Sequence, residues 1–277
     1  MANPRISVIM GIYNCASTLV EALDSLYAQT YQDFKIILCE DGSIDHTYHV
    51  ASDYAAKHDN IILIKNERNM GLNYTLNHCL EYADTEYVAR MDGDDISLPT
   101  RFEKEINFLD EHPEYAIVST PMIYFDELGE FGRGKQGDYE PGKEVMVYGP
   151  PFCHAPCMVR LEAYRAVGGY TIDSRLLRFE DYNLWMKMFA KGYRGYVLSD
   201  YLYAMRDNRA AIRRRTLKAA FRGVYAHYLA HEELKLPYYK LLNYAIKKIG
   251  SRLVPTTLYS FIHRKRLGVN NEEMVNK

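Results

Sequence analysis

Three carboxylates stand close together at Asp92, Asp94 and Asp95, and they are the residues of this sequence best suited to chemistry. They follow an extended run at residues 86–89, and Gly93 among them lets the backbone turn tightly. Carboxylates this close repel one another unless a cation neutralises them. Hard divalent cations are held by one or two carboxylates together with phosphate oxygens. Taken alone, the cluster is also typical of a solvated acidic turn or of a cap on the following helix.

The elements that must position this cluster alternate along the first hundred residues. Apolar runs typical of buried strands cover residues 5–14, 34–39, 61–64 and 87–89. Segments with helical periodicity lie between them, at residues 18–29, up to residue 58, and at 69–82. This alternation predicts an α/β fold with a doubly wound sheet, in which ligands bind beyond the carboxyl ends of the strands.

Polar, turn-forming sequences stand at four of these strand ends and are expected to share one rim of the sheet. They are Tyr13-Asn14, Glu40-Asp41-Gly42-Ser43, Asn69-x-Gly71 and Asp92-Gly93-Asp94-Asp95. Neither the glycine fingerprint of dinucleotide-binding folds nor a phosphate-binding loop ending in Gly-Lys-Ser/Thr is present there, which argues against a dehydrogenase or a P-loop ATPase. A nucleotide can still be held by one carboxylate on its base or ribose and a metal on its phosphates. Asp41 suits the first role and Asp94 the second.

Length and composition are those of a globular protein with one large domain, alone or with an appendage. The chain has 277 residues, of which 48% are hydrophobic and 25% charged. No long apolar segment opens it, and the five cysteines mostly lie in apolar runs, so we expect a cytoplasmic protein with reduced thiols. Cys153-His154-x-x-Cys157 could hold zinc, but no fourth ligand is visible nearby, which favours structural roles for these residues.

The net charge of −2 conceals an acidic body and a basic tail. Residues 208–271 carry 14 lysines and arginines against two acids, a net charge of +12, and the remainder carries −14. Basic and apolar residues alternate at helical spacing in this tail, as in helices that lie on anionic lipid. A solvated helix face packed against the body, or a nucleic-acid patch, would have a similar composition. We favour the membrane surface and no nucleic-acid partner.

Taken in order, these motifs give the chain a family resemblance. It resembles the family 2 nucleotide-sugar glycosyltransferases of the glycosyltransferase A type, and most of all those of bacterial exopolysaccharide, biofilm matrix and capsule biosynthesis. The likeness covers about the first 200 residues, and Gly11, where the family often has proline, is a small departure. The segments that carry it are Ser7-Val8-Ile9-Met10, Tyr13-Asn14, Asp41-Gly42-Ser43-x-Asp45-x-Thr47, Asn69-x-Gly71, Asp92-x-Asp94-Asp95 and Leu98-Pro99-x-Arg101-Phe102.

The resemblance implies a Rossmann-like, mostly parallel mixed sheet flanked by helices. It places a catalytic domain at residues 1–207, with a nucleotide-sugar half at about 1–120 and an acceptor half at about 121–207. Residues 208–277 would form a basic helical extension. The glycine- and proline-rich residues 126–151 predict a surface loop with one short hairpin, or a loop that orders over donor and acceptor.

The resemblance also implies roles for individual residues. Asp94, together with Asp92, would bind Mg²⁺ or Mn²⁺. Asp181 of the Glu180-Asp181 pair would be the catalytic base, although acids in the first turn of a helix are by themselves ordinary. Glu180 and His154 would lie on the acceptor side, and for His154 a structural role is equally well supported. The residues expected to bind the nucleotide-sugar are Ile12, Tyr13, Asn14, Asp41, Asn69, Gly71, Arg90, Asp92 and Gly93.

The function implied is inverting, metal-dependent transfer of a sugar from a nucleotide-sugar, expected to be a UDP-sugar, to a lipid-linked or oligosaccharide acceptor. The Gln-x-x-Arg-Trp motif of processive family members is absent, which predicts one sugar per encounter. We expect a location at the inner face of the plasma membrane. A scaffold or regulatory protein on the same fold is the alternative. A nucleotidyltransferase would need a glycine-rich, basic loop after the first strand, and none is present there.

Overall fold

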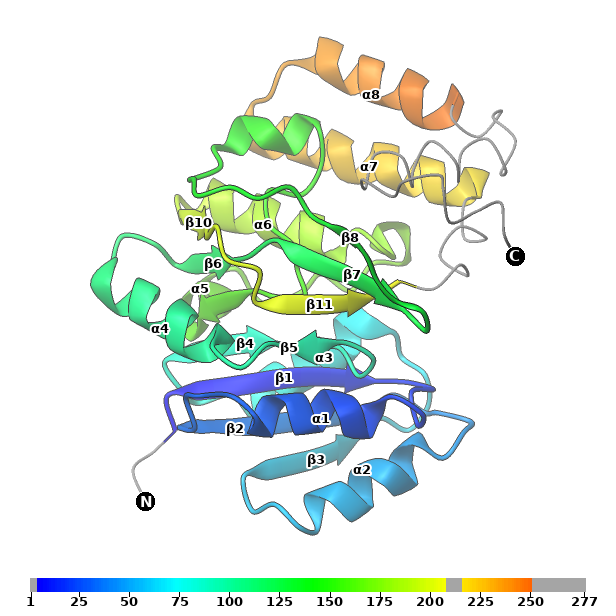
Figure 1. The fold of residues 1–277 in the computed structure, drawn as a ribbon. Helices are drawn as coiled ribbons and strands as arrows, with labels where there is room; N and C mark the ends of the chain where they lie inside the picture. Colours follow the sequence, from blue (N-terminus) through cyan, green and yellow to red (C-terminus); the bar gives the residue numbers. More distant parts are fainter. Residues whose placement is uncertain (1–3, 208–215, 251–277) are drawn as a thin grey trace.

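A seven-stranded mixed sheet forms the centre of the protein in a computed structural model that describes residues 4–207 and 216–250 (Figure 1). Its strand order is β10-β6-β9-β4-β1-β2-β3. Only β9 is antiparallel to its neighbours, β4 and β6, and the other pairs are parallel. The predicted mostly parallel mixed sheet is therefore confirmed. The strands are β1 (Ile6–Ile12), β2 (Phe34–Glu40), β3 (Ile61–Lys65), β4 (Tyr87–Arg90), β6 (Ile117–Ser119), β9 (Met158–Arg160) and β10 (Gly195–Val197).

Helices cover both faces of this sheet because its central strands are apolar on both sides. Val8 and Met10 of β1 belong to one core together with Leu23 of α1, whereas Ile9 belongs to a second core with Leu76 of α3. The first core is formed with α1 (Leu19–Tyr27), α2 (Thr47–Ala55) and α4 (Arg101–Glu111). The second is formed with α3 (Leu72–Glu81), α5 (Leu161–Ala166) and α6 (Glu180–Ala190).

A smaller sheet, in the order β5-β11-β7-β8, stands beside the end of β4. The acidic cluster leads directly from β4 into β5 and therefore lies between the two sheets. One short hairpin is expected within residues 126–151; the β7–β8 hairpin begins earlier, at Met122, and a 3₁₀ turn, η1 (Lys143–Val147), follows it. The strands are β5 (Ile96–Ser97), β7 (Met122–Asp126), β8 (Gly129–Arg133) and β11 (Tyr203–Arg206).

Two C-terminal helices are stacked on the second core. α7 (Leu217–Leu234) packs on α6, and α8 (Tyr238–Gly250) packs on α7, so that the three lie in successive layers in Figure 1. The Thr216 hydroxyl caps α7 by accepting a hydrogen bond from the Ala219 amide at 3.1 Å. Within residues 4–207 and 216–250, no helix is long and apolar enough to cross a bilayer. Two basic runs of the tail, Arg213-Arg214-Arg215 and His263-Arg264-Lys265-Arg266, lie outside the described residues.

Candidate active site

The polar ends of the first four strands converge as the sequence predicts. β1 lies between β2 and β4, with Ile9 opposite both Ile37 and Arg90, and β3 follows on the far side of β2. Because all four strands are parallel, the residues after Ile12, after β2 and after Arg90 emerge at the same edge. Tyr13 is 45% exposed there.

The loops after β1 and β2 are bonded to each other through motif side chains. The Asn14 amide donates to the Ser43 hydroxyl at 3.0 Å, and the Asn14 side-chain oxygen accepts from the Ile44 amide at 3.0 Å. Next to it, the Cys15 amide donates to the Thr47 hydroxyl at 2.8 Å. Asn14 itself has a left-handed backbone, with φ of 50°. These residues therefore shape the rim on which a ligand would lie.

Asp41 orders the turn that precedes α3. Its Oδ1 accepts hydrogen bonds from the Asn66 side chain at 2.7 Å and the Met70 amide at 2.8 Å, and its Oδ2 accepts from the Gly71 amide at 2.9 Å. A carboxylate has about four lone-pair sites, so these three donors leave room for one more. Asp41 is thus both a structural residue and an available acceptor at the rim.

Gly42 allows this turn to approach the loop after β2. Its φ is +69°, and a Cβ added there would lie 2.5 Å from the Asn69 nitrogen and 2.6 Å from the Arg68 carbonyl carbon. Both contacts are with backbone atoms, which cannot move aside cheaply. Asn69 is exposed at the rim, as a residue that contacts a nucleotide must be.

The acidic cluster separates into three environments, the first of which is an ion pair. Arg90 binds Asp92 in bidentate fashion, with nitrogen–oxygen distances of 2.6 and 2.7 Å. Asp92 keeps 30% of its side chain exposed, while Arg90 is buried. This pair presents a carboxylate whose orientation is fixed.

Asp94 and Asp95 are adjacent but differ in burial and in partners. Asp95 is 2% exposed and accepts hydrogen bonds from the Tyr203 hydroxyl at 2.9 Å and the Arg206 amide at 2.8 Å. Burial, reinforced by the charges of Asp92 and Asp94, raises the pKa of Asp95 to about 8. Asp94 is exposed, and no other residue in the described part of the chain donates a hydrogen bond to its carboxylate.

These residues fit a hard divalent cation that completes its shell with phosphate oxygens. Partial removal from water, and second the charge of Asp92, raise the pKa of Asp94, and the nearby charges of Arg206 and Arg90 do not fully offset this rise. The described residues hold no group of three or more His, Cys, Asp and Glu side chains that could form a complete metal cage. One or two carboxylates suit Mg²⁺ or Mn²⁺, which keep several ligand positions for water and substrate phosphates.

A second pair of acids, Glu180 and Asp181, begins α6, close enough to Arg90 for its charge to act on both. Burial, and second the Glu180 charge, raise the pKa of Asp181 to about 6. Oε2 of Glu180 is buried and has no hydrogen-bond partner among residues 4–207 and 216–250. Burial also raises the pKa of Glu180. The positive charge of Arg90 opposes this rise, and the negative charge of Asp92 adds to it. The first turn of α6 therefore lies within electrostatic reach of the rim.

His154, in the segment before β9, has a neutral ring. Its Nε2 is 2.8 Å from the Tyr170 hydroxyl, and its ring contacts Trp185 edge-on at 5.9 Å. Burial, and second the Arg90 charge, hold its pKa well below the usual value. The Cys157 thiol donates to the Cys153 carbonyl at 2.8 Å. The side chains of His154 and Cys157 therefore both have hydrogen-bond partners within the protein. These contacts favour a structural role for His154.

Comparison with known proteins agrees with this geometry. The family model described as "Glycosyl transferase family 2" matches residues 7–168. The chain belongs to glycosyltransferase family 2. It is 41% identical to the Bacillus subtilis protein named "Putative glycosyltransferase EpsE", over 99% of this chain and 98% of the relative. It is 30% identical to a UDP-Gal:alpha-D-GlcNAc-diphosphoundecaprenol beta-1,3-galactosyltransferase of Escherichia coli, over 95% and 96% of the two chains.

Solved structures of other glycosyltransferases share the fold. TarS of S. aureus, in complex with UDP-GlcNAc, superposes with a TM-score of 0.69 at 20% identity, covering 88% of this chain and 73% of that one. The mannosyltransferase PcManGT of Pyrobaculum calidifontis, in complex with GDP-Man and Mn2+, gives a TM-score of 0.64 at 18% identity, covering 95% and 80%. The glycosyltransferase A-type fold expected for the chain is thereby confirmed.

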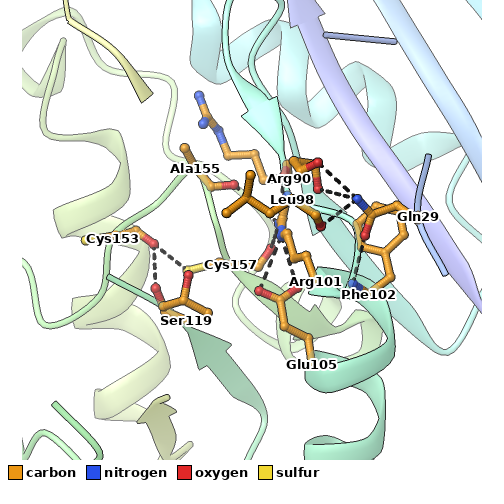
Figure 2. Close-up of polar contacts among 12 residues, drawn as sticks. Gln29, Arg90, Leu98, Arg101, Phe102, Glu105, Ser119, Cys153, Ala155 and Cys157 are labelled. Atoms are coloured by element: carbon orange, nitrogen blue, oxygen red, sulfur yellow. Dashed lines mark hydrogen bonds and ion pairs between the residues drawn. The ribbon is translucent and has the colours of Figure 1, made fainter. Parts of the chain in front are cut away.

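A buried ion pair between Arg101 and Glu105 supports the candidate site (Figure 2). Arg101 is fully buried, and its Nε lies 3.2 Å from Oε2 of Glu105. The same guanidinium donates to the carbonyls of Arg90 at 2.9 Å and Cys157 at 3.2 Å, which ties the end of β4 to the segment before β9. Gln29 holds the start of α4 from the other side, through the Leu98 carbonyl at 2.8 Å and the Phe102 amide at 3.1 Å.

Several positions in this glycosyltransferase have roles that the sequence did not predict. Asp95 holds β11, Ser43 and Thr47 hold the rim loops, and Arg101 supports Arg90. Each belongs to a motif, so the signal was present. Each motif, however, predicted only the family. It could not predict the hydrogen-bond partner of each side chain, because that partner lies in another part of the sequence.

Proposed function

We propose that this glycosyltransferase transfers one sugar per encounter, with inversion, from a UDP-sugar to a lipid-linked or oligosaccharide acceptor in exopolysaccharide or capsule synthesis. One observation carries the proposal. The charge of Arg90, which is paired with Asp92, acts both on Asp94 and on Asp181, a carboxylate of raised pKa, so both carboxylates lie near this one ion pair. A leaving diphosphate and an attacking hydroxyl need these two groups on separate sides of the sugar.

The donor would lie along the rim formed by the first four strands. Asp41 has one acceptor position left for the base or ribose, and Asn69 is exposed beside it. Uridine is favoured because the name of the E. coli relative includes UDP-Gal and the S. aureus structure contains UDP-GlcNAc. Ile12, Tyr13, Asn14 and Gly71 would complete the nucleotide contacts at the same strand ends.

Asp94, supported by Asp92, would hold Mg²⁺ or Mn²⁺ against the diphosphate. A bound divalent cation offsets the negative charge that develops on the leaving nucleoside diphosphate. The structure of the P. calidifontis mannosyltransferase is a complex with GDP-Man and Mn2+, which supports this assignment. Arg90 fixes the orientation of Asp92. A Cβ at Gly93 would lie 2.8 Å from the Cys15 sulfur, so only glycine lets this turn lie so close to the loop after β1.

Asp181 would act as the general base. With a pKa of about 6 it is largely ionised at neutral pH and more basic than an ordinary aspartate. It would remove the proton of the acceptor hydroxyl as that oxygen attacks the anomeric carbon from the face opposite the diphosphate. Glu180 would orient the acceptor, and His154 would support the floor of the acceptor side.

A lipid-linked acceptor would bring the protein to the inner face of the plasma membrane. The E. coli relative is named for an undecaprenol diphosphate acceptor. On α8, Leu242 and Ile246 are each 62% exposed, Lys247 lies beside them, and the helix contains no acidic residue. Apolar and basic residues on one exposed face suit an anionic lipid surface.

The proposed function is tested with a panel of UDP-sugars. Calorimetry with and without Mn²⁺ should show one UDP-sugar binding in a metal-dependent manner. Incubation of that sugar with a lipid-diphosphate-linked saccharide should then yield a product whose anomeric configuration, read by NMR, is inverted. A flat binding response across the panel would instead support the scaffold alternative, and a product of retained configuration would exclude inversion.

A further inference from the structure

Three aromatic rings from three helices form a continuous stack next to the candidate base. The buried ring of His227 in α7 lies between Tyr182 of α6, at a centroid distance of 4.5 Å, and Tyr244 of α8, at 3.5 Å. The interplanar angles are 28° and 20°. Burial, and second the charges of His231 and Lys248, lower the pKa of His227 to about 3, so the ring is neutral. A neutral ring can remain buried without a counter-charge.

Tyr182 connects this stack to Asp181. The Tyr182 backbone amide donates to Oδ1 of Asp181 at 2.7 Å. Its hydroxyl donates to the Met146 carbonyl at 2.5 Å and lies 3.2 Å from Nδ1 of His227. One end of the residue therefore contacts the candidate base, and the other is bonded to the C-terminal helices and to η1.

The residue before the acidic pair is also held by α7. Phe179 precedes Glu180 and packs at Gly223, where an added Cβ would lie 2.8 Å from its Cζ and 2.9 Å from the Tyr244 hydroxyl oxygen. Upstream, the Arg175 guanidinium lies 4.4 Å from the centroid of the Tyr225 ring, also in α7. The segment that leads into α6 and the first turn of α6 thus both rest on α7.

We infer that the α7–α8 pair positions the catalytic turn of α6, with His227 and Gly223 as positioning residues for Asp181. This inference rests on the proposed role of Asp181. A general base must be placed within a fraction of an ångström of its working position to act. The Asp181 carboxylate accepts a hydrogen bond from the Tyr182 amide, so a shift of Tyr182 would also shift the carboxylate. The C-terminal helices would then serve catalysis as well as the membrane.

His227→Ala, made in the full chain, removes the middle ring of the stack. We expect hydrogen exchange of the backbone amides at residues 179–183 to become faster, and kcat to fall roughly ten- to a hundredfold, as displacements of about 1 Å do. The affinity for UDP with Mn²⁺, measured by calorimetry, should stay within about twofold, because the donor rim is built from other elements. His227→Phe should restore both readouts by restoring the stack.

Two further variants keep the test decisive. Gly223→Ala should shift Phe179 and change exchange and kcat in the same direction, without leaving a cavity. Tyr228→Ala is the matched control, because Tyr228 follows His227 but is 44% exposed. It should leave exchange and turnover unchanged. Thermal melting would establish that each variant is folded.

The outcomes separate this inference from the proposed function. Unchanged exchange and unchanged kcat in His227→Ala would overturn the inference. So would a loss of UDP affinity as large as the loss of kcat, because that result means general loosening. Faster exchange at 179–183 with undiminished turnover would overturn it as well. If the wild-type protein turns over no UDP-sugar while exchange changes only at 179–183, the positioning stands and the proposed activity fails.

Discussion

Asp92, Asp94 and Asp95 show how far identical side chains diverge over four positions. Asp92 is paired with Arg90, Asp94 is exposed and receives no hydrogen bond from another described residue, and Asp95 is buried and bonded to Tyr203. The sequence predicts that the three act near a metal. It cannot predict this division, because Tyr203 is 108 residues from Asp95 and only the folded chain brings them together.

Replacing Asp94 tests the metal assignment. Asp94→Ala should abolish metal-dependent transfer while the protein remains folded, because the side chain is exposed and supports no other described group. Loss of a cation is worth several kcal/mol, so turnover should fall on the order of a hundredfold or more. Turnover at several Mn²⁺ concentrations measures this. Full activity in Asp94→Ala would assign the metal elsewhere.

Replacing Asp181 tests the base. Asp181→Asn should keep its affinity for the UDP-sugar and lose roughly 10²–10⁴-fold in kcat. In the wild-type protein, Asp181 must be ionised to accept a proton, and its pKa is about 6. The rate should therefore rise with pH through about 6 and level off above it. Undiminished turnover in Asp181→Asn, or a wild-type rate that is flat through pH 6, would remove Asp181 from this role.

At the scale of elements, Gly42 makes the turn between the β2 loop and Asn69 possible. Gly42→Ala should displace the backbone of Arg68 and Asn69 and weaken donor affinity roughly tenfold, equivalent to about 1.4 kcal/mol. Gly129→Ala is the control, because Gly129 also has a positive φ, +109°, but nothing lies within 4 Å of an added Cβ. It should affect stability alone. Equal donor affinities, measured by calorimetry, would contradict the prediction.

The Arg101–Glu105 pair places two opposite charges in the core next to the candidate site. Glu105→Ala should lower the free energy of unfolding by roughly 3–5 kcal/mol, because it leaves a buried guanidinium without its counter-charge. Glu111→Ala, at the exposed end of the same helix, should change it by less than about 0.5 kcal/mol. Chemical denaturation measures both. Equal values for the two variants would mean that Arg101 is compensated by the backbone carbonyls alone.

The elements themselves were largely predictable, and their long-range contacts were not. Apolar runs predicted the strands β1 to β4, because a strand buried on both faces must be apolar throughout. The shared rim followed from parallel pairing. By contrast, nothing local to His227 indicates that it lies between Tyr182 and Tyr244, since a buried histidine in a helix has the same sequence pattern whatever it contacts.

At the scale of the whole molecule, the basic C-terminal region should bind anionic vesicles. Lys247→Glu should reduce co-sedimentation with vesicles that contain phosphatidylglycerol, because each basic residue near such a surface contributes about 1 kcal/mol. Lys57→Glu, an exposed lysine beyond the end of α2, is the matched control for net charge. Equal binding by the two variants would show that α8 does not face the lipid.

The antiparallel strand β9 has a consequence for exchanging parts between relatives. It comes from residues 121–207, the half predicted to bind the acceptor, but lies between β4 and β6, which come from residues 1–120, and Arg101 bonds across the same junction. A chimaera joined near residue 120 would take β9 from one parent and both its neighbours from the other. Acceptor preference is therefore best transplanted through surface loops, with the strands kept from a single parent.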